Sequence, residues 1–253
     1  MRFDALPFAI GTIGFGVVCL AFGDFGLQWQ PVPEGVPGRT ALAYLNGILL
    51  VASGTLLLWP RTALGSARFL AGYFLLWVLL LKVPKVAAAP AVVLPWLGFA
   101  EILSLALGAA MLALLLDTTL RPAALRPLRY LYGVCPLIFG ISHFVYVDFT
   151  AAMVPAWIPG QLFWAWATGI GHVAAGAAIF SGIMARLAAT MLAGMMASFV
   201  LLLHVPRVIA DPTSQLEWTM LCVATALAGA AWIVRTAISH EEPPVAAPAV
   251  IPA

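Results

Sequence analysis

The sequence predicts an all-α membrane protein with about eight transmembrane helices, arranged as two parallel-oriented four-helix bundle repeats. The first observation behind this prediction is composition: of 253 residues, 63% are hydrophobic and 9% are charged, and the mean hydropathy is +1.04. Soluble domains carry about 25% charged residues. The second observation is an internal repeat, described below. The surface of this chain is therefore expected to face a lipid bilayer.

Long apolar runs define the expected spans. A helix needs about 20 apolar residues to cross the bilayer core, and only helices or closed barrels satisfy their backbone there. The runs between charges predict helices near residues 5–23, 40–60, 67–84, 92–116, 129–147, 161–182, 187–206 and 216–235. The third run is short and ends at Lys82, whose ammonium group is expected to snorkel to the interface. Pro84 and Pro206, at the ends of the third and seventh runs, are expected to stop those helices.

The distribution of basic residues predicts the orientation. With eight spans, eight of the 12 Lys and Arg residues lie in or beside the segments on the side of both termini, and four lie on the other side. Basic residues favour the cytoplasmic side. We therefore expect a protein of the plasma or inner membrane with both termini in the cytoplasm, and Trp29 among the residues at the outer interface.

The two halves of the chain align in one register. Val32-Pro33 and Val36-Pro37-Gly38 match Val154-Pro155 and Ile158-Pro159-Gly160 at a separation of 122 positions. The same separation relates residues 79–86 to residues 201–208 and relates Trp96 to Trp218. A repeat in one register indicates a duplicated unit. We expect a first four-span unit at 1–116, a cytoplasmic linker at 117–128, a second four-span unit at 129–235 and a disordered tail at 236–253.

The stretch from Thr168 to Ala189 carries a family resemblance. It contains Gly169, His172 and Gly176, followed by an Arg-Leu-Ala-Ala segment, and it resembles the second and third spans of DoxX-like proteins. That resemblance implies a four-helix unit and, for some members, a membrane subunit of sulfur- or quinone-linked oxidoreductases, with a partner oxidoreductase subunit. His172 stands where the family often has an acidic residue, and Leu50 stands there in the first half, so the role of that carboxylate does not carry over.

Ionisable and polar side chains at membrane depth are the candidate functional residues, because burying them in lipid is costly. His172 lies about 16 Å below the start of its helix, near the middle of the core. Thr168, Gly169 and Gly176 share its helix face, which predicts that the imidazole points into the bundle. His143 and His204 are expected in the outer half of the same unit, and Glu101 on an inward face of the fourth span.

Several roles remain open for these residues. Neutral imidazoles bind metal or haem and exchange protons with quinones, so a quinone or haem is the expected kind of cofactor if one is bound. Alternatively, each histidine donates to a carbonyl group or faces the interface. Cys19, Cys135 and Cys222 lie singly in apolar runs without ligand spacing, so no zinc site is predicted.

Three function classes follow from these features. The first is a membrane subunit of a redox assembly that holds a lipophilic substrate near His172. The second is a proton-coupled transporter that uses Glu101 and His172, and the third is a non-catalytic scaffold or chaperone. Walker, GxSxG, HExxH and dinucleotide-binding motifs are absent from the sequence. The net charge of +2 is not clustered, so nucleic-acid binding is not expected.

Overall fold

The computed structural model describes residues 5–117, 119 and 122–241, and these residues form helices joined by short connections. The helices are α1 (Leu6–Phe22), α2 (Arg39–Leu56), α3 (Ala63–Trp77), α4 (Val83–Ala88), α5 (Val93–Leu116), α6 (Leu125–Val145), α7 (Val147–Met153), α8 (Gln161–Ser181), α9 (Ala185–Phe199), α10 (Val205–Ala210) and α11 (Gln215–Glu241). Short turns of other helical types occur at η2 (Leu27–Trp29), η3 (Val78–Lys82), η4 (Pro122–Ala124) and η5 (Val200–His204).

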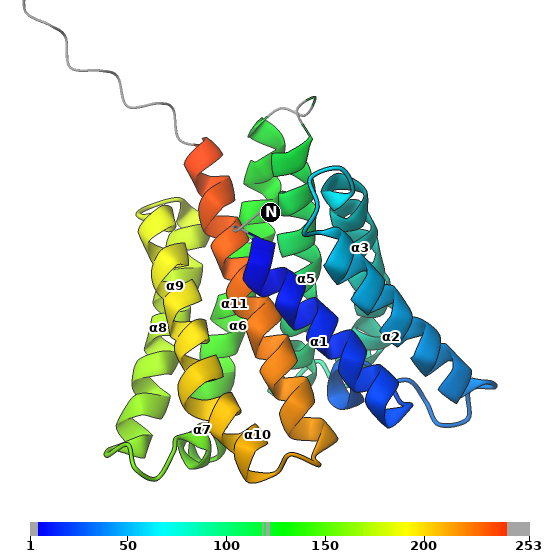
Figure 1. Ribbon diagram of the computed structural model, residues 1–253. Coiled ribbons are helices and arrows are strands. Elements are labelled where there is room, and N and C mark those ends of the chain that lie inside the picture. Colours follow the sequence, from blue (N-terminus) through cyan, green and yellow to red (C-terminus); the bar gives the residue numbers. More distant parts are fainter. Residues whose placement is uncertain (1–4, 118, 120–121, 242–253) are drawn as a thin grey trace, which may run out of the picture.

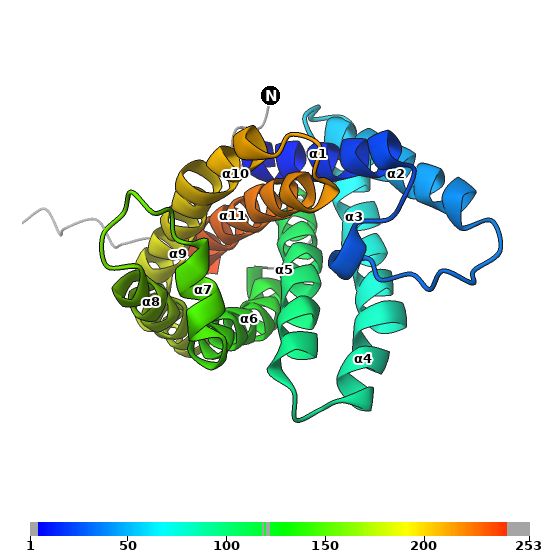
Figure 2. The same cartoon turned by 90° about the horizontal axis from the view of Figure 1, so that it is seen from below.

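Helices α5 and α11 lie at the centre of the molecule, with α1 to α4 on one side and α6 to α10 on the other (Figures 1 and 2). Helix α1 packs against α2 and α11, whereas α6 packs against α8 and α5. The first helix of each half therefore lies against the last helix of the other half. We call the end where α1 begins and α11 finishes the proximal end, and the end that carries α7 and α10 the distal end (Figure 1).

Six helical segments in the described part of the chain are long and apolar enough to cross a membrane: Ala63–Ala88, Val93–Leu116, Leu125–Val145, Gln161–Ser181, Ala185–Ala210 and Gln215–Glu241. Helix α1 is also apolar but has only 17 residues. Large apolar side chains cover the outside, and Leu80 is 61% exposed. Extended apolar surface of this kind is rare on soluble monomers. The fold is thus that of a multi-pass helical membrane protein.

Glycines allow two helix pairs to cross at very short distance. A Cβ atom on Gly16 of α1 would lie 2.6 Å from the Gly47 carbonyl oxygen of α2, and one on Gly140 of α6 would lie 2.6 Å from the Gly169 oxygen of α8. Small residues permit such close backbone approach between membrane helices. The α2 and α8 members of these contacts differ by 122 positions, and the α1 and α6 members by 124.

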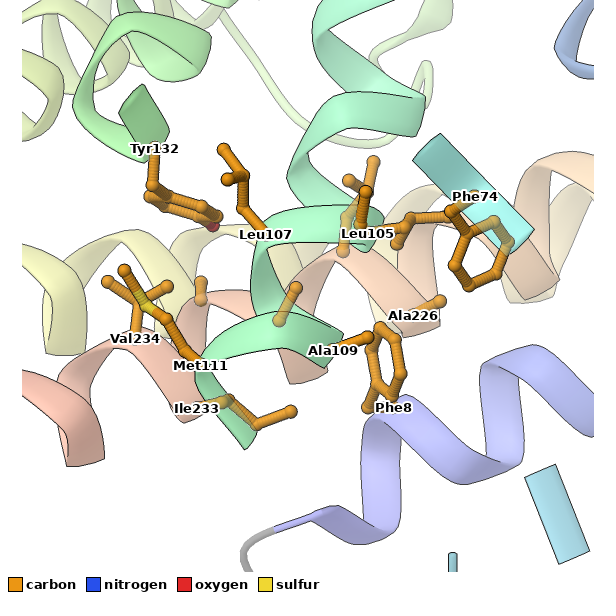
Figure 3. Packing of buried hydrophobic residues seen from close by; sticks show 14 of the residues in the cluster. Phe8, Phe74, Leu105, Leu107, Ala109, Met111, Tyr132, Ala226, Ile233 and Val234 are labelled. Atoms are coloured by element: carbon orange, nitrogen blue, oxygen red, sulfur yellow. The ribbon is translucent and has the colours of Figure 1, made fainter. Parts of the chain in front are cut away.

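The contact between α5 and α11 involves residues with matching positions in the two halves. A Cβ atom on Gly108 would lie 2.8 Å from the Cβ atom of Ala230, and the two residue numbers differ by 122. Contact between equivalent positions is what a two-fold arrangement produces. Around it, Phe8 of α1 and Phe74 of α3 meet edge to face at 6.4 Å beside Leu105 and Ala109 of α5 (Figure 3).

The third and seventh predicted helices do not stop at their prolines. Each continues through a π-helical turn, η3 or η5, into a further α-helical turn, so the segments end at Ala88 and Ala210. A proline in a helix clashes with the carbonyl group four residues earlier and lacks an N–H donor. The wider π turn just before Pro84 and Pro206 shifts the hydrogen-bond register by one residue. The expected proline stop was therefore wrong.

Other boundaries agree to within a few residues, with differences at two connections. Helix α6 begins at Leu125, inside the stretch expected as a linker, and α11 continues to Glu241, so residues 236–241 of the expected tail are helical. Residues 242–253 of that tail lie outside the described residues. The chain enters α2 through Gly38 and α8 through Gly160, and both glycines have the positive φ angles, 68° and 74°, that favour this residue.

Candidate functional site

The imidazole rings of His143 on α6 and His172 on α8 are in contact. Their centroids lie 5.0 Å apart, and the His172 ring also meets Phe139 at 5.5 Å and Phe199 at 6.1 Å. His172 is 3% exposed, so it points into the bundle as its small-residue helix face predicted. The two rings come together because Gly169, one turn before His172, brings α8 against the Cβ atom of His143 and the ring of Phe144.

The two rings differ in their hydrogen bonds. His143 Nδ1 lies 2.9 Å from the Phe139 carbonyl oxygen. A carbonyl oxygen only accepts, so Nδ1 carries the hydrogen and Nε2 keeps a lone pair in the neutral ring. His172 Nδ1 is buried and has no hydrogen-bond partner among the described residues. Orphaned buried polar atoms are rare and call for an explanation such as an absent ligand or water.

Thr168 and His204 do not join this pair. The Thr168 hydroxyl group donates to the Trp164 carbonyl oxygen of its own helix at 2.7 Å. His204 ends the π turn η5, is 7% exposed and leaves its own Nδ1 without a partner in the described structure. No cluster of three His, Cys, Asp or Glu residues suited to a metal ion occurs among residues 5–117, 119 and 122–241. The three candidate histidines are thus a pair and a separate residue.

Glu101 belongs to a different cluster, in the first half. Lys82, at the end of η3, and the indole group of Trp29 both interact with its carboxyl group. The Lys82 ammonium group donates to the Gln28 carbonyl oxygen at 2.7 Å and packs against Gly98 of α5. Lys82 is only 3% exposed, so the expectation that it snorkels to the interface was wrong.

A buried hydrogen-bonded network in the first half was not predicted from the sequence. Gln30 Nε2 donates to Asn46 Oδ1 at 2.8 Å, and Asn46 Nδ2 donates to Gln30 Oε1 at 3.0 Å and to Cys19 Sγ at 3.3 Å. The Tyr73 hydroxyl group donates to Asn46 Oδ1 at 2.8 Å. Trp29, expected at the interface, is buried beside this network. The segment before α2 therefore inserts into the bundle of the first half.

The network and the histidine pair occupy matching positions. The α1–α6 separation of 124 places Cys19 opposite His143, and the α2–α8 separation of 122 places Asn46 opposite Thr168 and Leu50 opposite His172. Asn46, an asparagine inside an apolar run, was the signal in the sequence for this network. Its partner Gln30 lies in a loop, so sequence spacing did not predict that the two side chains meet.

A pocket of 270 Å³ opens at the distal end of the second half. Its walls come from the end of α7, the start of α8 and the η5–α10 segment, and include Ala152, Met153, Gln161, Leu203 and Arg207. Arg207 forms two hydrogen bonds to the carboxylate of Glu217, at 2.8 and 2.6 Å, so its charge is partly neutralised. The pocket is thus a shallow, mainly apolar depression above the bundle.

Comparison with known proteins adds no relative. No family model, no curated protein and no solved structure matches this chain. The chemistry of the site therefore has to be argued from its own residues.

Proposed function

We propose that the chain crosses the bilayer eight times as two DoxX-like four-span units of parallel orientation, with both termini in the cytoplasm of a plasma or inner membrane. In support, the π turns, the positive-φ glycines before α2 and α8 and the close helix crossings all recur at separations of 122 or 124 positions. The Trp96 and Trp218 indoles even donate to equivalent carbonyls, of Pro90 and Pro212, both at 2.9 Å. On this orientation the distal end faces outward.

The function that we propose is a membrane subunit of a redox assembly that holds a quinone-like lipophilic molecule at the His143–His172 pair. The observation that carries it is the buried, unpartnered Nδ1 of His172 in an aromatic setting formed with Phe139 and Phe199. A carbonyl or hydroxyl group of a quinone would satisfy that nitrogen, and the rings offer flat apolar contact. Electrons would pass to or from a partner oxidoreductase subunit.

A haem held by both histidines does not fit. Two axial ligands of one haem lie on opposite faces of the macrocycle, whereas these rings pack directly against each other at 5.0 Å between centroids. The pair thus favours an organic molecule bound by hydrogen bonds and ring contacts.

The test is equilibrium binding of duroquinone to the purified full chain in nanodiscs, with extraction of any quinone that copurifies. Removing a hydrogen bond worth about 1.4 kcal/mol weakens binding about tenfold. We therefore expect His172→Phe to raise the dissociation constant about tenfold, and His240→Phe, at the proximal end of α11, to leave it unchanged. Equal dissociation constants for wild type and His172→Phe would refute the quinone site.

Proton-coupled transport is the second candidate, and the interaction between buried Lys82 and Glu101 favours it. An acid and a base inside one bundle are suited to proton movement coupled to a substrate. Uptake driven by a proton gradient in vesicles, lost in Glu101→Gln and kept in Glu34→Gln, would support this function. If neither quinone binding nor uptake is found, a scaffold or chaperone role remains as the third candidate.

A further inference from the structure

The His143 ring is held in one tautomer by its own helix. His143 lies in the last turn of α6, and its ring leans back along the helix, as helical side chains do. Its Nδ1 atom thereby meets the Phe139 carbonyl oxygen at 2.9 Å, and Ser142 Oγ donates to the same oxygen at 2.7 Å. Because Nδ1 has to donate there, Nε2 of the neutral ring has a lone pair and no hydrogen. Toward a ligand, His143 is therefore an acceptor only.

The surroundings of the pair favour uncharged rings. The His172 ring contacts the rings of His143, Phe139 and Phe199. In the described part of the chain no ion pair joins either histidine to a carboxylate. A charge without a partner in an apolar interior is costly, so both imidazoles are expected to be neutral. The hydrogen-bonding roles of neutral imidazole thus decide which ligand the pair can bind.

The second ring is free to take either role. His172 Nδ1 is buried and has no hydrogen-bond partner among the described residues. A neutral imidazole has one N–H group and one lone pair, so this ring can donate to a ligand or accept from it. The centroids of the two rings lie 5.0 Å apart, so a single small ring can contact both. The pair therefore combines a fixed acceptor, His143, with an adaptable group, His172.

The two redox forms of a quinone suit this combination differently. A quinone carbonyl oxygen only accepts, so it can bind the N–H group of His172 but offers no hydrogen to His143 Nε2. A quinol hydroxyl group both donates and accepts, so it can satisfy the two histidines together. Polar atoms left unpaired in an apolar setting weaken a complex. The fixed acceptor at His143 therefore favours the ligand that carries O–H groups.

We infer that the His143–His172 pair selects an aromatic ring that bears a hydroxyl group, and that it holds a quinol in preference to the quinone. The inference rests on the proposed function for the quinone skeleton, whereas the need for a donor on the ligand follows from the tautomer of His143. One additional hydrogen bond corresponds to about tenfold tighter binding. For a two-electron couple, a tenfold preference for the reduced form raises the midpoint potential of bound duroquinone by about 30 mV.

Durenol, a tetramethylated phenol, and its methyl ether test the donor requirement, because they differ in one O–H group and neither is a quinone. We expect the full chain in nanodiscs to bind durenol about tenfold more tightly than the ether. His143→Gln places an amide near the position of Nε2 and should keep this preference, whereas His143→Asn places its amide near Nδ1 and should abolish it. Ser142→Ala removes the other donor to Phe139 and should leave the preference unchanged.

Thermal unfolding of each variant shows that it is folded before binding is measured. Equal dissociation constants for durenol and its ether in the wild-type protein would overturn the inference. A preference that survives in His143→Asn would do the same. Loss of the preference in both amide variants would assign the effect to the packing of the imidazole ring and overturn the acceptor role of Nε2.

Duroquinol, kept reduced under anaerobic conditions, and duroquinone separate this inference from the proposed function. Tighter binding of duroquinol, with both dissociation constants raised in His172→Phe, supports the inference and the function. Equal binding of the two forms, with the same dependence on His172, keeps the function and overturns the inference. A preference for durenol in a protein that binds neither duroquinol nor duroquinone keeps the selection of a hydroxyl group and overturns the quinone function.

Discussion

Substitution of alanine for Gly140 tests whether the close crossing of α6 and α8 holds the second half together. The added Cβ atom would lie 2.6 Å from the Gly169 carbonyl oxygen and 3.0 Å from the Val173 nitrogen. Carbon–oxygen contacts are normally at least about 3.3 Å, so the helices must separate by about 0.7 Å. Overpacking of this kind costs about 1–3 kcal/mol, and alanine regains about 0.5–1 kcal/mol in helix stability.

The net expected loss is about 1–2 kcal/mol, or a fall in Tm of about 2–8 °C for a chain of this size. Thermal unfolding in detergent, followed by tryptophan fluorescence, measures it. Gly16→Ala, at the matching crossing of α1 and α2, should cost the same. Gly72→Ala and Gly194→Ala, which are also separated by 122 positions and meet nothing within 4 Å, should leave Tm unchanged or raise it. A Tm for Gly140→Ala equal to that for Gly194→Ala would refute this account of the crossing.

Substitutions at three further positions probe the polar contacts. Asn46→Ala strands the buried carboxamide of Gln30 and should lower the free energy of unfolding by about 1–3 kcal/mol, measured by denaturation in mixed micelles; an unchanged value would contradict the network. Hydrogen bonds from Thr119, together with the charge of Arg68, lower the pKa of Asp117. The ionised Asp117 carboxylate therefore stabilises the fold fully above the ordinary pKa of 3.8, and this stabilisation is lost as the pH falls below that value. Asp117→Asn should flatten that part of the pH–Tm profile. Arg129→Met leaves the carbonyl groups at the end of α8 without their guanidinium donor and should lower Tm by several degrees, with Arg129→Lys intermediate.

Most helix positions could be predicted from the sequence, because the length of an apolar run and the charges that bound it are properties of one local segment. The runs that predicted spans one, four and six correspond closely to α1, α5 and α8. The local sequence did not show whether the helices stop at Pro84 and Pro206 or continue past them. A proline that stops a helix in water can be carried in a membrane helix, where the wider π turn and neighbouring helices satisfy the freed backbone groups.

Part of the candidate site was predicted because the residues involved lie close together in the sequence. The small residues beside His172 lie on its own helix, so their spacing was enough to point the ring inward. Lys82 was misplaced because its environment is made by Gly98 on the next helix and Gln28 in a loop, contacts that no local pattern reveals. The contact of His143 with His172 likewise depends on the register of two helices, which the glycine contacts set.

The two halves differ in how their buried polar groups are satisfied. A polar position inside a membrane bundle must be satisfied, and the chain can meet that need from within or leave it to a ligand. In the first half the loop before α2 supplies Gln30, whose carboxamide meets the polar groups of Asn46 and Cys19. In the second half, His172 keeps a buried Nδ1 without a hydrogen-bond partner among the described residues. A ligand that accepts a hydrogen bond from His172 should therefore raise the Tm of the wild-type protein and leave that of His172→Phe unchanged.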